Sequence, residues 1–589
     1  MAETLISPGV LARENDSSFV SRRPVTAGAA IIGPTVKGPV EIPTIVTTFS
    51  EYANIFGTTF DSGSVTNSKT YTYFTSIAAY NYFVNGGTSL LVARVVTGSA
   101  TALPGAFIGA TTTTASAGND AIKDYNNSES FALETLSEGI IMNNSGSQTA
   151  GALISGSKDN VRYQIVNSNT GSGTFDLLIR RGDDNALTPT VLETFTMLSL
   201  DPNSPNFISR VIGDQIQNYN NATIQIETTG SYANRSNYIR VKNVNVTTLN
   251  YFDNNGVAKL AYTSSIPINK SGSFGGATGT IRGNAKFYND IFYTNASSND
   301  TQGLTAECYT NMINLLSNTD DFKFNVLLTP GLIDGFTGHV SAISSIITNT
   351  QNRGDNIYVL DPVGYGSVVS AAVAAAGTRN TSYAAEYWPW CQVVDPSTGD
   401  LVWVPASTVI GGVYAYNDSV AEPWFAPAGI NRGGLSQVVR VEQKLSAANR
   451  DTLYNGKVNP IATFPGTGIV VYGQKTLQTR ASALDRVNVR RLLIALKSYI
   501  SQIALNLVFE QNTIATRNQF LSQTNPYLTS VQQRQGLYAF KVIMDETNNT
   551  PDVIDRNELV GKIFVQPTKT AEFIYLDFNI TPTGATFGA

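Results

Sequence analysis

Residues 322–328 read FKFNVLL and residues 357–360 read IYVL, two short apolar runs. Runs of this length bounded by turn residues are typical of buried strands. The segment between them, VSAISSIITNT at 340–350, and the segment after them, SVVSAAVAAA at 367–376, have the length and composition of helices. Strands that alternate with helices predict an α/β domain.

The same domain includes an earlier part of the chain. Residues 71–84 carry apolar side chains at helical spacing, and residues 90–96 read as a buried strand. At Thr97 the composition changes. We therefore predict a discontinuous middle α/β domain made of residues 21–96 and 305–458.

The chain between these two parts has a different composition. Residues 97–150 are rich in Thr, Ser, Ala, Gly and Asn, and strand-like segments return further on. These segments are 161–166, 175–180, 222–227 and 238–244. We predict that residues 97–304 are mostly β and inserted into the α/β domain. A break near residue 150 divides them into two insertions, 97–150 and 151–304.

Residues 383–440 are expected to be irregular, because they are dense in Trp and Pro. Long connections of this kind are usually functional or interface elements. Their tryptophans are Trp388, Trp390, Trp403 and Trp424. These indoles could stack on sugars, so a carbohydrate-binding surface protein is one alternative. We prefer packing at domain joints, since no convergent pair of carboxylates accompanies them.

The C-terminal part, residues 459–570, is predicted to be one α+β domain. Residues 469–473 read as a strand, and residues 488–507 form the clearest helix, with one apolar stripe at 3.6-residue spacing. A second helical stretch follows, interrupted near Pro526. The strands 538–544 and 562–565 complete the domain.

Both ends of the chain read as strands that need a partner edge. The N-terminal stretch is short and extended, and residues 573–580 alternate in the period of a half-buried strand. Each end either closes a sheet of its own subunit or is donated to a neighbouring subunit. The candidate donated residues are Leu5, Ile6, Val10, Ile574, Leu576, Phe578 and Ile580.

Composition excludes several classes of protein. The 589 residues include one histidine and two cysteines and carry a net charge of −5. A His-rich metal site, a disulfide framework and a four-cysteine zinc site are therefore excluded. A nucleic-acid binder that relies on overall basic charge is not expected. No apolar run reaches the ~18 residues of a membrane span, and no secretory signal is visible. We expect the protein to fold in a cytoplasm.

The sequence carries no motif of an enzyme or a cofactor site. Walker A, dinucleotide, G-x-S-x-G and H-E-x-x-H motifs are missing from it. His339 could pair with Cys308 or Cys391, but no cysteine-protease signature supports that pairing. The carboxylate pairs are Asp183–Asp184, Asp320–Asp321 and Asp545–Glu546. They lie at turn-like positions, so we expect them in solvated loops.

One basic face deserves a functional hypothesis. Arg486, Arg490 and Lys497 fall within ~40° of one another at 100° per residue, and ~100° from the centre of the apolar stripe. A solvated helix flank is the ordinary interpretation. The functional interpretation is a basic track that meets an acidic partner.

Several short motifs occur in a specific order along the chain. They are ISPGV at 6–10, AIIGP at 30–34, SYAAEYWPW at 382–390, WFAPAG at 424–429, GIVVYGQKTL at 468–477 and AEFI at 571–574. In this order they resemble the sheath proteins of contractile bacteriophage tails. Residues 97–304 carry little of the resemblance.

The resemblance implies a mechanical role. Sheath subunits form hexameric discs stacked around an inner tail tube, and contraction drives the tube through the host envelope. Residues 1–20 and 571–589 would be arms that exchange strands with neighbours. The C-terminal domain, with Arg486, Arg490 and Lys497, would face the tube, and the insertions would face outward.

The resemblance also implies the partners and the place of the protein. The partners would be other copies of the chain, the inner tube, the baseplate and the tail terminator, with no cofactor, no enzyme activity, no direct nucleic-acid contact and no membrane insertion. The protein would be part of the virion tail, assembled in the host cytoplasm. A second alternative is the sheath of a related injection machine, such as a bacteriocin or a secretion system.

Overall fold

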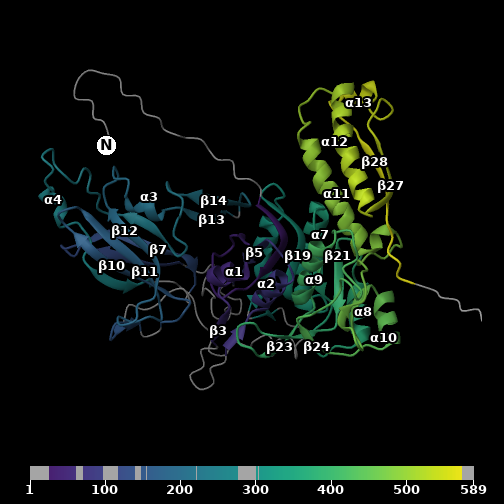
Figure 1. Cartoon of the computed structure of the whole chain (residues 1–589), viewed down its shortest axis with the longest axis horizontal. Coiled ribbons are helices and arrows are strands. Elements are labelled where there is room, and N and C mark those ends of the chain that lie inside the picture. Colours follow the sequence, from purple (N-terminus) through teal and green to yellow (C-terminus); the bar gives the residue numbers. More distant parts are fainter. Residues whose placement is uncertain are drawn as a thin grey trace, which may run out of the picture.

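The computed structural model describes residues 25–61, 70–96, 117–139, 148–153, 156–220, 222–275, 300–302 and 304–573. Figure 1 shows a β-rich part, a central part built on a large sheet, and a pair of long helices that projects from the central part. We call these the insertion domain, the central domain and the C-terminal domain. The chain is thus an α+β protein of several domains.

The central domain is built on an eight-stranded sheet in the order β2-β5-β1-β19-β20-β21-β25-β26. The six inner strands are parallel to their neighbours, and the edge strands β2 and β26 are antiparallel. The strands are β1 (Val25–Gly33), β2 (Thr44–Val46), β5 (Leu90–Arg94), β19 (Phe322–Ile333), β20 (Ile357–Asp361), β21 (Ala384–Trp388), β25 (Val458–Phe464) and β26 (Gly468–Val471).

Helices cover both faces of this sheet. Alternate strand residues point to opposite sides, so Ile31 and Leu328 belong to one hydrophobic core while Ile32 and Leu327 belong to the other. The first core includes side chains of α1 (Phe49–Phe56), α2 (Phe74–Val84) and α9 (Ser407–Val420). The second includes those of α6 (Thr310–Leu315), α7 (Val340–Arg353), α8 (Val369–Gly377) and α10 (Ala447–Asn455). The predicted alternation of strands and helices after residue 322 is confirmed.

Two predictions about this domain were wrong. β25 and β26 were assigned to the C-terminal domain, but β25 is hydrogen-bonded to β21 and extends the central sheet. Residues 383–440, expected to be irregular, contain helix α9. They also contain a three-stranded sheet of β22 (Cys391–Val394), β23 (Leu401–Val404) and β24 (Val438–Val441).

Two glycines allow α9 to pack closely against its neighbours. A Cβ atom on Gly411 would lie 2.5 Å from Leu328 Cδ1, and one on Gly412 would lie 2.7 Å from the carbonyl oxygen of Asn81. The glycines therefore let α9 approach both the sheet and α2 closely. The packing gained in this way outweighs the low intrinsic helix propensity of glycine.

The described residues of the insertion domain share one hydrophobic core. Its larger sheet is β12 (Val191–Ser199), β11 (Thr174–Arg181), β10 (Val161–Asn169) and β16 (Lys270–Ser273), and its smaller sheet is β15 (Ile239–Val244), β7 (Glu129–Glu138) and β6 (Ala117–Lys123). Phe131 of β7 stacks on Phe175 of β11, with ring centres 5.5 Å apart. Since β7 pairs with β15, the break expected near residue 150 does not separate two cores.

Shorter elements complete these two domains. In the insertion domain they are β8 (Gln148–Thr149), β9 (Ala152–Leu153), α3 (Ile208–Ile212), β13 (Ile216–Asn220), β14 (Gln225–Thr229) and α4 (Leu260–Thr263). In and beside the central domain they are β3 (Thr59–Asp61), β4 (Thr70–Thr72), β17 (Asp300–Thr301) and β18 (Leu304–Thr305).

The chain leaves and re-enters the central domain near the carboxyl ends of its parallel strands. After β5, the amide of Val95 donates to the carbonyl of Gly33 at 3.2 Å. On the return, Thr301 Oγ1 donates to the carbonyl of Gly331 at 2.8 Å, and Gln302 Nε2 donates to that of Pro330 at 3.0 Å. Both connections therefore lie beside neighbouring strands.

The C-terminal domain packs two helices against a two-stranded ribbon. Its elements are α11 (Val487–Leu505), α12 (Ile514–Gln533), β27 (Leu537–Ile543), α13 (Pro551–Asp555) and β28 (Lys562–Pro567). The predicted interruption near Pro526 is wrong, because α12 continues through this residue. Pro526 is exposed, so water can bind the backbone carbonyl that its missing N–H leaves free. No helix in the described parts of the chain is long and apolar enough to cross a membrane.

Candidate functional site

The candidate site lies where the end of the described chain returns to the base of α11. Arg486 Nε donates to Glu572 Oε1 at 2.8 Å, and Arg486 Nη2 donates to Glu572 Oε2 at 3.0 Å. The pair is bidentate, the geometry in which an arginine and a carboxylate bind most strongly. The two side chains are 24% and 19% exposed. Arg486 thus has an acidic partner within its own chain.

Two further side chains donate to the same carboxylate. Tyr454 of α10 donates its hydroxyl to Glu572 Oε2 at 2.6 Å, and Gln474 Nε2 donates to Oε1 at 3.1 Å. Burial by itself raises the pKa of Glu572, but the hydrogen bonds from Arg486 and Tyr454 outweigh it and hold this pKa below its ordinary value. Glu572 is therefore ionised at neutral pH. No individual role for Glu572 could be predicted from the sequence, because its partners lie far away along the chain.

Arg490 and Lys497 lie further along the same side of α11. Arg490 is buried, with its guanidinium carbon 4.0 Å from the centre of the Tyr383 ring and a hydrogen bond to Ser382 Oγ. Lys497 is exposed, and its Nζ lies 3.4 Å from the hydroxyl of Tyr383. The predicted basic face is therefore largely engaged with the central domain. Contact of these three residues with a tube stays a prediction.

A hollow of about 590 Å³ lies between residues 481–489 and residues 569–573. Phe573, at the edge of this hollow, is 69% exposed. The seven candidate residues of the terminal arms, Leu5, Ile6, Val10, Ile574, Leu576, Phe578 and Ile580, lie outside the described residues. The structure thus describes residues 571–573, the first residues of the predicted C-terminal arm.

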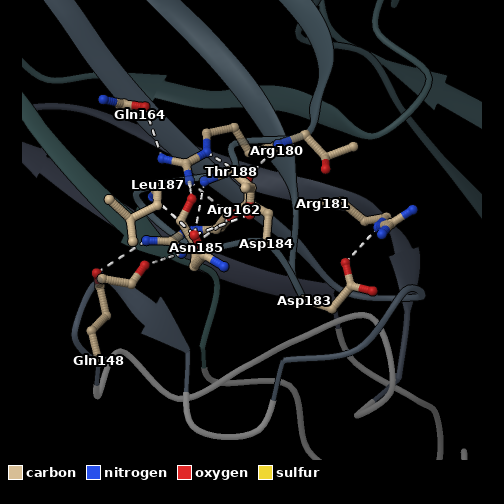
Figure 2. A network of polar contacts seen from close by, with 12 residues as sticks. Gln148, Arg162, Gln164, Arg180, Arg181, Asp183, Asp184, Asn185, Leu187 and Thr188 are labelled. Atoms are coloured by element: carbon tan, nitrogen blue, oxygen red, sulfur yellow. Dashed lines mark hydrogen bonds and ion pairs between the residues drawn. The ribbon is translucent and has the colours of Figure 1, made fainter.

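The prediction that the carboxylate pairs lie in solvated loops is wrong for Asp184. Figure 2 shows this side chain between Arg162 and Arg180. Arg180 Nε donates to Asp184 Oδ2 at 2.7 Å, and Arg162 Nη1 lies 3.3 Å from Oδ1. All three side chains are buried. Asp183, in contrast, pairs with Arg181, as Figure 2 also shows, and both of these side chains are partly exposed.

The Asp184 network fixes two loops of the insertion domain on β10 and β11. Arg162 also donates to the carbonyl of Gly151 at 2.9 Å and to Gln148 Oε1 at 3.0 Å, and Arg180 donates to the carbonyl of Asn185 at 2.9 Å. Every acceptor is a group of the domain itself. The arrangement is a structural cross-link between strands and loops, with no open coordination position at the carboxylate.

The tryptophans do not form a sugar-binding surface. Trp388, Trp390 and Trp424 are buried, and the indole Nε1 of Trp390 donates to the carbonyl of Val363 at 2.9 Å. Trp424 Nε1 donates to the carbonyl of Arg534 at 3.0 Å, which joins the central and C-terminal domains. Trp403 is half-buried under the guanidinium of Arg440. Packing at a domain joint is therefore confirmed for Trp424, whereas Trp388, Trp390 and Trp403 pack within the central domain.

His339 and Cys391 are each placed unfavourably for a nucleophile–base pair. His339 is buried, and its Nδ1 accepts a hydrogen bond from the amide of Ile333 at 3.0 Å. Cys391 is buried, and burial raises the pKa of its thiol. A reactive cysteine needs the opposite shift. Within the described ranges, no group of three or more His, Cys, Asp or Glu side chains is placed to hold a metal ion.

Comparisons with known proteins identify the two regions that contain this site. Residues 302–477 match the model of the phage tail sheath protein central domain, and residues 479–581 match that of the phage tail sheath C-terminal domain. Residues 302–581 belong to the phage tail sheath family.

Relatives of this sheath family are similar in sequence over a limited stretch. The tail sheath protein of Vibrio phage KVP40 is 48% identical over 185 residues, and that of Enterobacteria phage T4 is 41% identical over 185 residues. Each match covers 31% of this chain and 28% of the relative. The chain therefore matches less than a third of the length of either relative.

The sheath fold extends over more of the chain than the sequence similarity does. The crystal structure of a sheath tail protein from Listeria innocua aligns with 92% of this chain and 95% of its own, with a TM-score of 0.51 and 9% identity. At this identity the likeness shows the fold alone. The sequence matches thus place residues 302–581 in the phage tail sheath family, and the structural likeness shows that the fold is shared over more of the chain.

Proposed function

We propose that the protein polymerises as stacked hexameric discs around an inner tail tube, and that contraction of this array drives the tube through the host cell envelope. The observation that carries the proposal is the family match at residues 302–581, which covers the central sheet and the C-terminal domain. The contraction would release a stored conformational state of the array. It would need neither a nucleotide nor a catalytic residue.

The two-stranded ribbon of the C-terminal domain is the proposed acceptor for the arms. Among the described residues, β27 and β28 pair only with each other, so each strand has an open outer edge. A two-stranded ribbon is marginally stable, and an added strand gains main-chain hydrogen bonds worth ~1 kcal/mol each. Residues 1–20 and 571–589 of neighbouring subunits would supply such strands.

The C-terminal domain is proposed to face the inner tube, with the insertion domain on the outside. Lys497 is the exposed member of the basic face, and exposed ionic contacts worth ~0–1 kcal/mol suit a grip that must be released. The tube, the baseplate and the tail terminator are the proposed partners, and the host cytoplasm is the proposed place of assembly. A phage is the proposed owner, since the relatives described above are phage proteins.

Electron microscopy of the purified protein, with and without co-expressed tube protein, tests the proposal. We expect hollow tubes or stacked rings. Truncation at residue 573, or deletion of residues 2–13, should abolish them while the remaining chain stays folded by circular dichroism. Monomers in every condition, including the co-expression, would contradict the sheath mechanism. Tubes that form equally well without either arm would contradict strand exchange alone.

A further inference from the structure

We propose that Glu572, held by Arg486, Tyr454 and Gln474, is a clamp that carries mechanical load from the C-terminal arm into the central domain. This inference rests on the proposed function, in which the arm is bound by a neighbouring subunit. The clamp would act at the first residues of the arm, so that tension further along the arm does not reach β28. Glu572 would then position the arm that a neighbouring subunit binds by strand exchange.

The path of the chain supports this assignment. Behind β28, Thr568 is still attached to the C-terminal domain, because its Oγ1 donates to the carbonyl of Gln535 at 2.6 Å. Two residues later, Thr570 Oγ1 accepts a hydrogen bond from Gln474 Nε2 at 2.6 Å. Glu572 then meets Arg486 and Tyr454. The chain therefore crosses to the base of α11 within five residues.

The donors to Glu572 come from three separate elements. Tyr454 belongs to α10, Gln474 follows β26, and Arg486 precedes α11. The Lys475 ammonium lies 4.3 Å from the centre of the Tyr454 ring and adds positive charge beside the carboxylate. A force on Glu572 is thus shared by α10 and the end of β26 in the central domain and by the start of α11 in the C-terminal domain. The bidentate geometry needs the fork of an arginine, which a lysine does not provide.

β28 alone would be a poor anchor for the arm. Among the described residues it pairs only with β27, and Pro567 at its end is paired with Leu537. Tension on residue 568 would act on this last pair and break the ladder one hydrogen bond at a time. In the clamp, four charge-assisted hydrogen bonds to one carboxylate must break together, and each is about twice as strong as a neutral one.

Single-molecule pulling tests the clamp. One handle is attached to the C-terminal residue and the other to the exposed β22–β23 turn of the central domain. At fixed load, we expect the lifetime before the first rupture to fall about 10- to 100-fold in Glu572→Gln. Tyr454→Phe, which removes one donor and keeps the ring, should give a smaller fall in the same direction. Glu558→Gln, at an exposed ion pair with Arg556, is the matched control and should leave the lifetime unchanged.

The outcomes separate this inference from the proposed function. An unchanged lifetime in both Glu572→Gln and Tyr454→Phe would overturn the clamp, whether or not the protein assembles. If Glu572→Gln fails to fold, Tyr454→Phe alone decides in the same way. A shortened lifetime in a protein that forms no tubes with its tube partner would support the clamp and contradict the sheath mechanism. Assembly of Glu572→Gln into tubes that break at lower load than wild type would support both.

Discussion

The guanidinium carbon of Arg490 lies 4.0 Å from the centre of the Tyr383 ring, and the same guanidinium donates to Ser382 Oγ. Arg490 belongs to α11, and Tyr383 directly precedes β21 of the central sheet. The contact therefore joins the C-terminal domain to the central domain through a buried cation. Its burial distinguishes Arg490 from Lys497, although both lie on the face that the sequence singled out.

We expect Arg490→Ala to lower the free energy of unfolding by about 2 kcal/mol. The change removes a desolvated cation–π contact and a charge-assisted hydrogen bond. Lys497→Ala is the matched control and should cost less than about 0.5 kcal/mol, because its side chain is exposed. Urea unfolding of both variants checks this. A Lys497→Ala variant that is stable but forms no tubes would favour the predicted tube contact, whereas equal stability of both variants would refute the structural role of Arg490.

Asp184→Asn should destabilise the insertion domain by about 3–5 kcal/mol. The substitution leaves Arg162 and Arg180 buried without their counter-ion. Asp183→Asn, one residue away at an exposed pair, should change stability by less than about 1 kcal/mol. Hydrogen exchange of β10 and β11 amides measures the difference locally. Similar protection in the two variants would show that the network is not needed for the domain.

The pH dependence of stability should include a contribution from Asp361. Burial raises the pKa of this carboxyl to about 7, despite two hydrogen bonds from Ser407. In the unfolded chain its pKa is about 3.9. The folded protein therefore binds more protons between about pH 4 and pH 7, so the stabilisation present below pH 4 is lost as the pH rises to 7.

Asp361→Asn removes this contribution. Between about pH 4 and pH 7, the free energy of unfolding of the variant should therefore decrease less than that of the wild type, by at most about 4 kcal/mol. The fall would not vanish, because burial also raises the pKa of Glu442 to about 7. Urea titrations at pH 5 and pH 8 measure the change. Asp400→Asn, at an exposed turn, is the control. A slope that is identical in Asp361→Asn and wild type would contradict the assignment.

Gly412→Ala should cost about 1–3 kcal/mol. The new Cβ would lie 2.7 Å from the backbone carbonyl of Asn81, which cannot move without shifting α2. Gly377→Ala is the matched control, since a Cβ there meets nothing within 4 Å. We expect it to be neutral or slightly stabilising, because alanine reduces the entropy of the unfolded chain. Thermal unfolding of the two variants distinguishes them, and an equally stable Gly412→Ala would disprove close packing of α2 and α9.

Local patterns in the sequence predicted much of the fold. The runs at 322–328 and 357–360 are strands, and the apolar stripe of 488–507 is the helix α11, because each of these elements has its periodicity in its own residues. The pairing of β25 with β21 could not be read in this way. It depends on contacts between residues about 70 positions apart.

The candidate site was predicted less well, for the same reason. The helical spacing of the basic residues predicts that Arg486 and Arg490 lie on one side of α11. It does not predict what packs against that side. Glu572 binds Arg486 and Tyr383 contacts Arg490, and both of these partners are distant in the chain. Asp184 likewise looked like a turn residue until β10 and β11 brought two arginines to it.

The two connections of the insertion domain, at Val95 and at Thr301, lie near the carboxyl ends of the neighbouring strands β1 and β19. A segment with this topology is a module that can be lengthened, shortened or exchanged while the register of the sheet stays the same. Recombination could therefore replace this module without rebuilding the central sheet. The same junction offers protein engineers a position for displaying a foreign domain on a contractile particle.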